Sequence, residues 1–263
     1  MCGIAGYSLS DESRVDRTLA AQALLAGIAE RGADAVGYAW RDGGAEVQVR
    51  KQRSGASALL DELHVPAAAT QALIHVRDYT KGHPSIAANN HPIRHGSVVG
   101  IHNGVIANDD ELLAAEGLER QHPEMTVDSE VIFAFAEQSG NRASVFERFV
   151  GSMATGWMDE RVPSVVFVAR AVGRPLWTGR TRHETFFAST RDALEVVEDT
   201  LRMTLTKREV DEGTLIALQN GRIAWTERFS PDRTHVEEPL PAVRSAEEGR
   251  SCLARLAAIA ATA

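Results

Sequence analysis

The stretch that decides the fold is GIAGYSL, residues 3–9, which follows Met1 and Cys2 at the start of the chain. This short run of small and apolar residues predicts a first buried β-strand. Removing Met1 would leave a thiol and a free α-amine on the residue just before that strand. The thiol has an ordinary pKa of about 8.5, and the α-amine, at about 7.7–8.0, is a base suited to activating it. The alternative is an ordinary strand that happens to follow a cysteine.

The composition limits the class of protein. A chain of 263 residues suits one large domain or two small ones, and 44% hydrophobic with 24% charged residues is ordinary for a globular protein. The net charge of −8 argues against nucleic-acid binding, which needs a clustered basic surface. The sequence has neither an apolar run near the ~18 residues of a membrane span nor a secretory signal. With two cysteines, Cys2 and Cys252, no disulfide framework is indicated. We therefore expect a cytoplasmic protein that binds neither membrane nor nucleic acid.

Hydrophobic periodicity predicts an α+β chain. Apolar spacing indicates a helix over Val15–Glu30, and cap signals predict two more, one after Asn108 through Ala115 and one after Asp128 through Glu137. Further strands are expected at Val36–Arg41, Glu46–Arg53, Ala72–Arg77, Val98–His102, Ser164–Val172, Pro175–Thr178, Thr185–Ser189, Thr214–Gln219 and Arg222–Glu227. Hairpin turns are expected at Gly43-Gly44 and Asn220-Gly221. This order suggests two sheets with helices on their outer faces.

Most of the residues that can carry chemistry lie in separate short motifs. These are CGIAG (2–6), RGADAVG (31–37), IHVRDYTKGHP (74–84), NNHP (89–92), GIHNGVIAN (100–108) and DSEV (128–131). In this order and spacing they resemble the class II glutamine amidotransferases, most closely the glutaminase domain of glucosamine-6-phosphate synthase. The likeness extends more weakly to about Thr226. It implies a four-layer αββα sandwich of the N-terminal-nucleophile (Ntn) hydrolase type, acting on L-glutamine.

The resemblance implies the catalytic roles. Cys2 matches the nucleophile that attacks the side-chain amide carbon of glutamine, with its own α-amine as the base. Asn103 and Gly104 match the oxyanion hole, formed by a side-chain amide and a backbone N–H. Losing one such donor typically costs about 10²–10³ in rate. The alternative for Asn103-Gly104 is a plain turn after a strand.

The resemblance also implies the binding roles. Arg77 matches the residue that grips the substrate α-carboxylate, where a fork of donors suits a planar anion. Asp128 matches the partner of the substrate α-ammonium, although a helix cap would also explain it. Thr80 lies in the loop that covers bound glutamine in such proteins. Supporting positions are Arg31, Asp34 and His91.

A metal site is the main rival interpretation of the central region. Five of the nine histidines fall between His75 and His102, but none forms a His-Glu-x-x-His pattern or a helical i, i+4 pair. We therefore expect no metal ion and no other cofactor.

Two departures from the family pattern concern the covering loop and the chain length. Asp78 stands where an aromatic residue is expected after the arginine, and Lys81 is also unusual there. We expect the amidotransferase domain to span residues 1–230, followed by a polar segment and an Ala-rich helix over 231–263. That tail is too short for an ammonia-using domain, so the acceptor is expected to be a synthetase on a separate chain.

Several alternatives stay open at this point. The chain could be an amidase for another γ-glutamyl amide, or a catalytically idle relative with a binding or regulatory role. A homo-oligomer is compatible with the sequence. If Met1 were retained, the α-amine of Cys2 would be an amide and could not act as a base.

Overall fold

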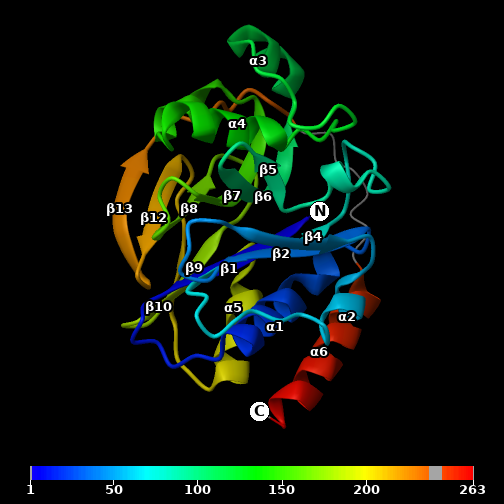
Figure 1. The fold of residues 1–263 in the computed structure, drawn as a ribbon, viewed down its shortest axis with the longest axis vertical. Helices are drawn as coiled ribbons and strands as arrows, with labels where there is room; N and C mark the ends of the chain where they lie inside the picture. Colours follow the sequence, from blue (N-terminus) through cyan, green and yellow to red (C-terminus); the bar gives the residue numbers. More distant parts are fainter. Residues whose placement is uncertain (1, 237–244, 263) are drawn as a thin grey trace.

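Two β-sheets lie face to face between outer helices in the computed structural model, which describes residues 2–236 and 245–262 (Figure 1). The first sheet has the order β11-β9-β10-β1-β4-β2-β3 and the second the order β13-β12-β8-β7-β6-β5, and every pairing within them is antiparallel. The strands of the first sheet are β1 (Gly3–Leu9), β2 (Ala35–Arg41), β3 (Gln48–Gln52), β4 (Gln71–Arg77), β9 (Trp177–Arg180), β10 (Glu184–Ala188) and β11 (Thr206–Glu209). Those of the second are β5 (Ile93–His95), β6 (Val98–Ile106), β7 (Gly151–Asp159), β8 (Val165–Arg170), β12 (Thr214–Gln219) and β13 (Arg222–Arg228).

The helices form the two outer layers. On the first sheet lie α1 (Arg17–Ile28), α2 (Ala56–Leu59), α5 (Arg191–Leu201) and α6 (Ala246–Ala260), whereas α4 (Glu130–Ser139) packs on the second sheet with α3 (Asp109–Glu116) beside it (Figure 1). Short 3₁₀ turns occupy Ala29–Arg31, Ala87–Asn89 and Ala143–Arg148. Because a Cβ on Gly100 of β6 would lie 2.0 Å from the Phe133 ring, this glycine lets α4 approach the sheet closely.

Three apolar clusters fill the three interfaces between these layers. Leu24, Tyr38 and Phe186 belong to the cluster under the helices of the first sheet, and Phe133 and Trp157 belong to the one under α4. A third cluster, including Ile4, Ile101 and Phe187, lies between the sheets. Burial of such side chains contributes roughly 1.5–3 kcal/mol each. The prediction of an α+β four-layer sandwich is confirmed.

Most predicted strands are present, with shifts of a few residues at their ends. The strand predicted over Pro175–Thr178 begins and ends two residues later, and the helix predicted from Val15 begins at Arg17, where the Asp16 carboxylate accepts from the Leu19 N–H at 2.8 Å. The Asn220-Gly221 turn has φ values of 49° and 73°, as a tight hairpin requires. The sequence analysis did not predict β5, β7, β11, α2 or α5.

Two predicted helix caps are wrong. The Asn108 side chain accepts from Val150 N at 3.0 Å and donates to Arg148 O at 3.0 Å, so it joins α3 to the start of β7 instead of capping the helix. Asp128 lies two residues before α4, and its carboxylate accepts from the Ile106 N–H of β6 at 2.7 Å. Tertiary hydrogen bonds outcompete the local cap in both cases.

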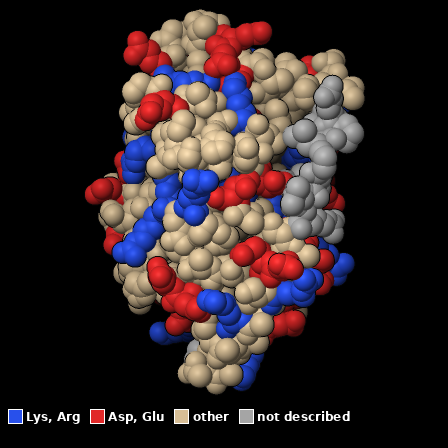
Figure 2. All heavy atoms as spheres, turned by 90° about the vertical axis from the view of Figure 1, so that its right-hand side faces the viewer, with Lys and Arg blue, Asp and Glu red and all other residues tan. Residues whose placement is uncertain are grey.

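The surface and the C-terminal helix add three observations. Acidic and basic side chains are interspersed over the face drawn in Figure 2, without one continuous basic area. Within residues 2–236 and 245–262, no helix combines the length and apolar character needed to cross a bilayer.

Helix α6 packs on α1 and buries Cys252 and Leu256. The domain boundary near residue 230 stays a prediction, and part of the 231–263 segment lies outside the described residues.

Candidate active site around Cys2

Cys2 and Arg77 lie at the same end of the first sheet because β1 and β4 pair with Gly3 opposite Val76. The Cys2 thiol donates to the backbone carbonyl of Asp78 at 3.3 Å. Arg31 braces the other side, since its Nε donates to the Cys2 carbonyl at 2.9 Å. The nucleophile predicted from the sequence is therefore held between two segments distant in the chain.

The electrostatic surroundings keep the thiol protonated at rest. Burial raises the pKa of the Cys2 thiol, and the positive charge of Arg77 acts in the opposite direction. A protonated thiol is a poor nucleophile, so the site needs a base within reach. The α-amine of Cys2 could serve as that base if Met1 were removed. Met1 itself lies outside the described residues.

Arg77 is buried, and its guanidinium donates three hydrogen bonds to protein groups. Nη1 donates to the Asn90 side-chain oxygen at 2.6 Å, and Nη2 donates to the carbonyls of Lys81 (2.9 Å) and Gly82. These acceptors occupy donors that a substrate carboxylate would use. The sequence analysis expects Arg77 to bind a carboxylate. In the structure, carbonyls of the covering loop accept its hydrogen bonds instead.

The covering loop, residues 78–85, is fastened at both ends. Near its start, the Tyr79 N–H donates to the Asp34 carboxylate at 2.9 Å, and Asp34 N donates to Arg77 O at 3.0 Å. Further along, the Lys81 ammonium donates to both carboxylate oxygens of Asp109 at 2.7 Å and to Asp110 at 2.9 Å. Arg120 also pairs with Asp109, at 2.9 Å. These contacts hold the loop in place.

The cavity beneath this loop is nearly closed. The site brings together six of the predicted residues, because its lining includes Cys2, Arg77, Thr80, His91, Gly104 and Asp128. The space open to the centre of a water molecule is only about 10 Å³, about what one water needs. A ligand of amino-acid size therefore requires the loop to move.

Asp128 lies on the α4 side of the cavity with a perturbed acidity. Burial raises the pKa of its carboxyl to about 6, opposed by the hydrogen bond from Ile106 N–H. Ser129 Oγ, 3.4 Å away, donates to the same carboxylate. A buried carboxylate of this kind is stabilised by an incoming cation, which suits the predicted partner of a substrate ammonium.

Asn103 and Gly104 belong to β6 and not to a turn, so the alternative interpretation is wrong. Gly104 has φ 149°, and a Cβ there would lie 1.9 Å from the Ser152 carbonyl oxygen, so only glycine fits. The Asn103 side chain is 1% exposed and has no hydrogen-bond partner among the described residues. An unsatisfied buried amide costs about 1–3 kcal/mol. Such a donor, ready for a developing charge, is what an oxyanion hole requires.

Two of the clustered histidines, His75 and His91, form a stacked, neutral pair. The His75 and His91 rings stack with centroids 4.2 Å apart, and burial lowers the pKa of both. His91 lines the Cys2 cavity, and His102 bonds to Ser129 Oγ at 2.9 Å. Within residues 2–236 and 245–262, no three His, Cys, Asp or Glu side chains are arranged to hold a metal ion.

One residue of the site was not assigned by the sequence analysis. Asn90 accepts from Arg77, and its side-chain N–H donates to the Pro84 carbonyl at 2.8 Å, so it ties the clamp to the covering loop. The sequence analysis includes Asn90 only as part of the NNHP motif, because nothing in the sequence identifies the partners of its side-chain amide. Thr80 also lines the cavity, but its side chain makes no hydrogen bond within the described part of the chain.

These features define a class of protein: a four-layer sandwich with a thiol on the residue just before its central strand β1. Comparison with known proteins narrows this class. Residues 77–196 match the family model described as a glutamine amidotransferase domain. Glutamine--fructose-6-phosphate aminotransferase (isomerizing) of Caulobacter vibrioides is 30% identical over 257 residues, covering 92% of this chain and 39% of that protein. The Vibrio parahaemolyticus enzyme of the same name is 30% identical over 227 residues, 81% of this chain and 35% of that protein.

Solved structures agree on the fold. Glutamine phosphoribosylpyrophosphate amidotransferase from B. subtilis, complexed with ADP and GMP, superposes with a TM-score of 0.68 at 20% identity, covering 86% of this chain and 49% of that one. The structure titled the allosteric regulatory enzyme of purine biosynthesis gives a TM-score of 0.66 at 22% identity, with coverage of 86% and 49%. The chain belongs to the class II, N-terminal-nucleophile glutamine amidotransferases. It spans less than two-fifths of the curated relatives it matches.

Proposed function

We propose that this chain hydrolyses the side-chain amide of L-glutamine through a thioester on Cys2 and supplies the ammonia to an acceptor synthetase on a separate chain. The observation that carries this proposal is the convergence of Cys2, Arg77, Gly104 and Asp128 on one cavity. The family membership supports the same activity. Neither the proposal nor its support involves a cofactor, and a reducing cytoplasm is the setting that suits a free thiol.

In this mechanism the α-amine of Cys2 takes the thiol proton while the sulfur attacks the amide carbon of glutamine. Arg77 would hold the substrate α-carboxylate and Asp128 its α-ammonium. The Asn103 amide and the Gly104 N–H would stabilise the oxyanion. Collapse breaks the C–N bond, and ammonia leaves with the proton returned by the amine. Water then hydrolyses the thioester, which releases glutamate and restores the thiol.

The test is covalent labelling by a diazo-ketone analogue of glutamine, followed by peptide mass spectrometry. We expect the label on Cys2 and none on the buried Cys252, with N-terminal sequencing of active material beginning at Cys2. Cys2→Ala should abolish glutamine hydrolysis, and Cys252→Ala is the matched control that should retain it. Labelling at Cys252, or activity that survives Cys2→Ala, would overturn the mechanism.

The closed cavity is the one observation that favours a catalytically idle binding relative. In that case Cys2 would resist the diazo-ketone even at saturating concentration, although the protein is folded. An amidase for another γ-glutamyl amide would instead be labelled, and free glutamine would not be its best substrate.

A further inference from the structure

A groove of about 610 Å³ runs along the free edge of β3, apart from the Cys2 cavity. Strand β3 is the last strand of its sheet. Within residues 2–236 and 245–262, one row of its backbone N–H and C=O groups therefore has no neighbouring strand. Such an edge is a ready template for another extended chain.

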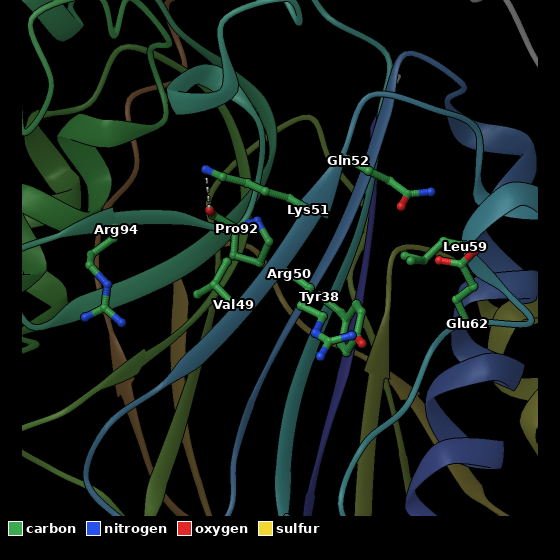
Figure 3. A pocket seen from close by; sticks show the side chains of 9 residues that line it. All are labelled: Tyr38, Val49, Arg50, Lys51, Gln52, Leu59, Glu62, Pro92 and Arg94. Atoms are coloured by element: carbon green, nitrogen blue, oxygen red, sulfur yellow. Dashed lines mark hydrogen bonds between the residues drawn. The ribbon is translucent and has the colours of Figure 1, made fainter.

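The groove extends over both faces of this edge strand. Figure 3 shows Lys51 and Pro92 on one side of β3, and Gln52, Leu59 and Glu62 on the other. An added strand would point alternate side chains to these two sides. This is the geometry of strand addition, in which main-chain hydrogen bonds provide affinity and flanking pockets provide selectivity.

The charges in the groove favour an acidic occupant. Arg50 and Lys51 lie next to each other on β3, and within the described part of the chain neither forms an ion pair with a carboxylate. The Lys51 ammonium instead donates to the carbonyls of Asn90 (2.7 Å) and Pro92 (3.3 Å). Burial lowers the pKa of Lys51 to about 8, a shift that a carboxylate placed beside it would reverse.

The same charges disfavour a second copy of this chain as the occupant. Two β3 strands paired antiparallel about Arg50 would place Arg50 opposite Arg50, and pairing about Lys51 would do the same with Lys51. Like charges directly opposite each other destabilise a strand pair. Self-pairing is thus disfavoured in these two registers, whereas a strand of opposite charge is attracted in both.

We infer that this groove binds an extended acidic segment of a partner protein, which adds to the first sheet as a strand beside β3. The occupant would also be linked to the Cys2 site. Lys51 donates to Asn90 O, and Asn90 accepts from Arg77 and donates to Pro84 of the covering loop. The binding itself does not depend on the proposed glutaminase chemistry.

The test uses the whole protein and a fluorescein-labelled octapeptide of alternating Glu and Val, followed by fluorescence anisotropy. We expect saturable binding that Arg50→Glu weakens about tenfold or more, because cross-strand attraction becomes repulsion. Arg222→Glu is the matched control, since Arg222 is an exposed residue of β13, the terminal strand of the other sheet. It should leave the affinity unchanged. If Arg50→Glu does not fold, Arg50→Gln provides the same comparison with a smaller loss.

A second probe separates strand addition from plain charge attraction. The same octapeptide with alternate backbone nitrogens methylated keeps its charge but cannot complete the ladder, so its affinity should fall about tenfold or more. Equal binding of both probes, or an equal loss in Arg222→Glu, would overturn the inference. So would sedimentation showing a dimer of the free protein that Arg50→Glu dissociates, because a second copy would then fill the groove.

Discussion

Replacing Lys81 by methionine should tighten glutamine binding, because Lys81 fastens the covering loop in a position that leaves no room for the substrate. Its ammonium lies 2.7 Å from Asp109 and 2.9 Å from Asp110. Its carbonyl occupies Arg77 Nη2 at 2.9 Å. If glutamine enters by displacing the loop, the Lys81 contacts must break, so they weaken the observed affinity.

The magnitude follows from the exposure of the partners. Asp109 is 2% exposed and Asp110 is 71% exposed, so Asp109 is the partner that matters. A hydrogen bond to a charged group is worth about 1.5–3 kcal/mol. Because the Lys81 side chain is 37% exposed, solvent screening reduces this to about 1–1.5 kcal/mol. At about 1.4 kcal/mol per tenfold change, Kd should fall about 5- to 10-fold.

The assay is calorimetric titration of glutamine into Lys81→Met in the Cys2→Ala background, so that no substrate is consumed. Lys207→Met is the matched control, since Lys207 pairs with Glu198 at β11 and α5, outside the lining of the Cys2 cavity. It should leave Kd unchanged. An unchanged or higher Kd in Lys81→Met would show that the loop admits glutamine without breaking the Lys81 contacts, and the reasoning would fail.

Three further outcomes are expected at the site. Arg77→Lys keeps the charge but not the fork, so KM for glutamine should rise about 10- to 100-fold, measured by steady-state glutamate release; an unchanged KM would misplace the carboxylate clamp. The Asp128 carboxyl, with its pKa raised to about 6, is protonated as pH falls through that value. The acid limb of kcat/KM should therefore show an apparent pKa near 6, and Asp128→Asn should lower kcat/KM at neutral pH and remove that limb. Burial is the main cause that raises the pKa of the Cys2 thiol, and the negative charge of Asp78 adds a small contribution in the same direction. Asp78→Asn should therefore speed iodoacetamide alkylation of Cys2 at pH 7 by about twofold, with buried Cys252 as the internal reference. An unchanged alkylation rate would show that the Asp78 charge does not affect the pKa of the Cys2 thiol.

Local sequence signals predicted the parts of the fold that local physics determines. The first strand was predicted with its correct bounds, and the Asn220-Gly221 turn followed from its demand for positive φ. Strand β7 was missed because all nine of its residues are buried, so the sequence shows no alternation. Strand β11, TKRE, is polar and extended only because it pairs with β9. Helix α5 did carry a signal, since Thr190 caps it through Ala193 N–H, and the sequence analysis overlooked it.

In the candidate site too, local features could be predicted from the sequence and long-range contacts could not. The roles expected of Cys2, Arg77 and Asp128 came from the resemblance of their motifs to a known family, because a thiol, a guanidinium and a carboxylate each suit one kind of chemistry. The closed loop did not, since it depends on pairs such as Lys81 with Asp109 that lie 28 residues apart. The role of Asn90 was hidden for the same reason. An amide has no charge to suggest its partners before the fold brings them together.

Access to the Cys2 site can change only through contacts that differ between the closed loop and an open one. The closed loop is held by contacts of Lys81 to Asp109 and Asp110, of Arg77 to the Lys81 and Gly82 carbonyls, and of Asn90 to Arg77 and Pro84. Glutamine competes with the carbonyls that Arg77 now holds, but it reaches neither Asp109 nor the β3 edge while the cavity is closed. A strand bound beside β3 would reach Lys51, and through it the carbonyl of Asn90. Among these residues, Asn90 alone contacts Lys51 of β3, Arg77 and the covering loop. A partner bound beside β3 would therefore change how readily glutamine enters by acting through Asn90.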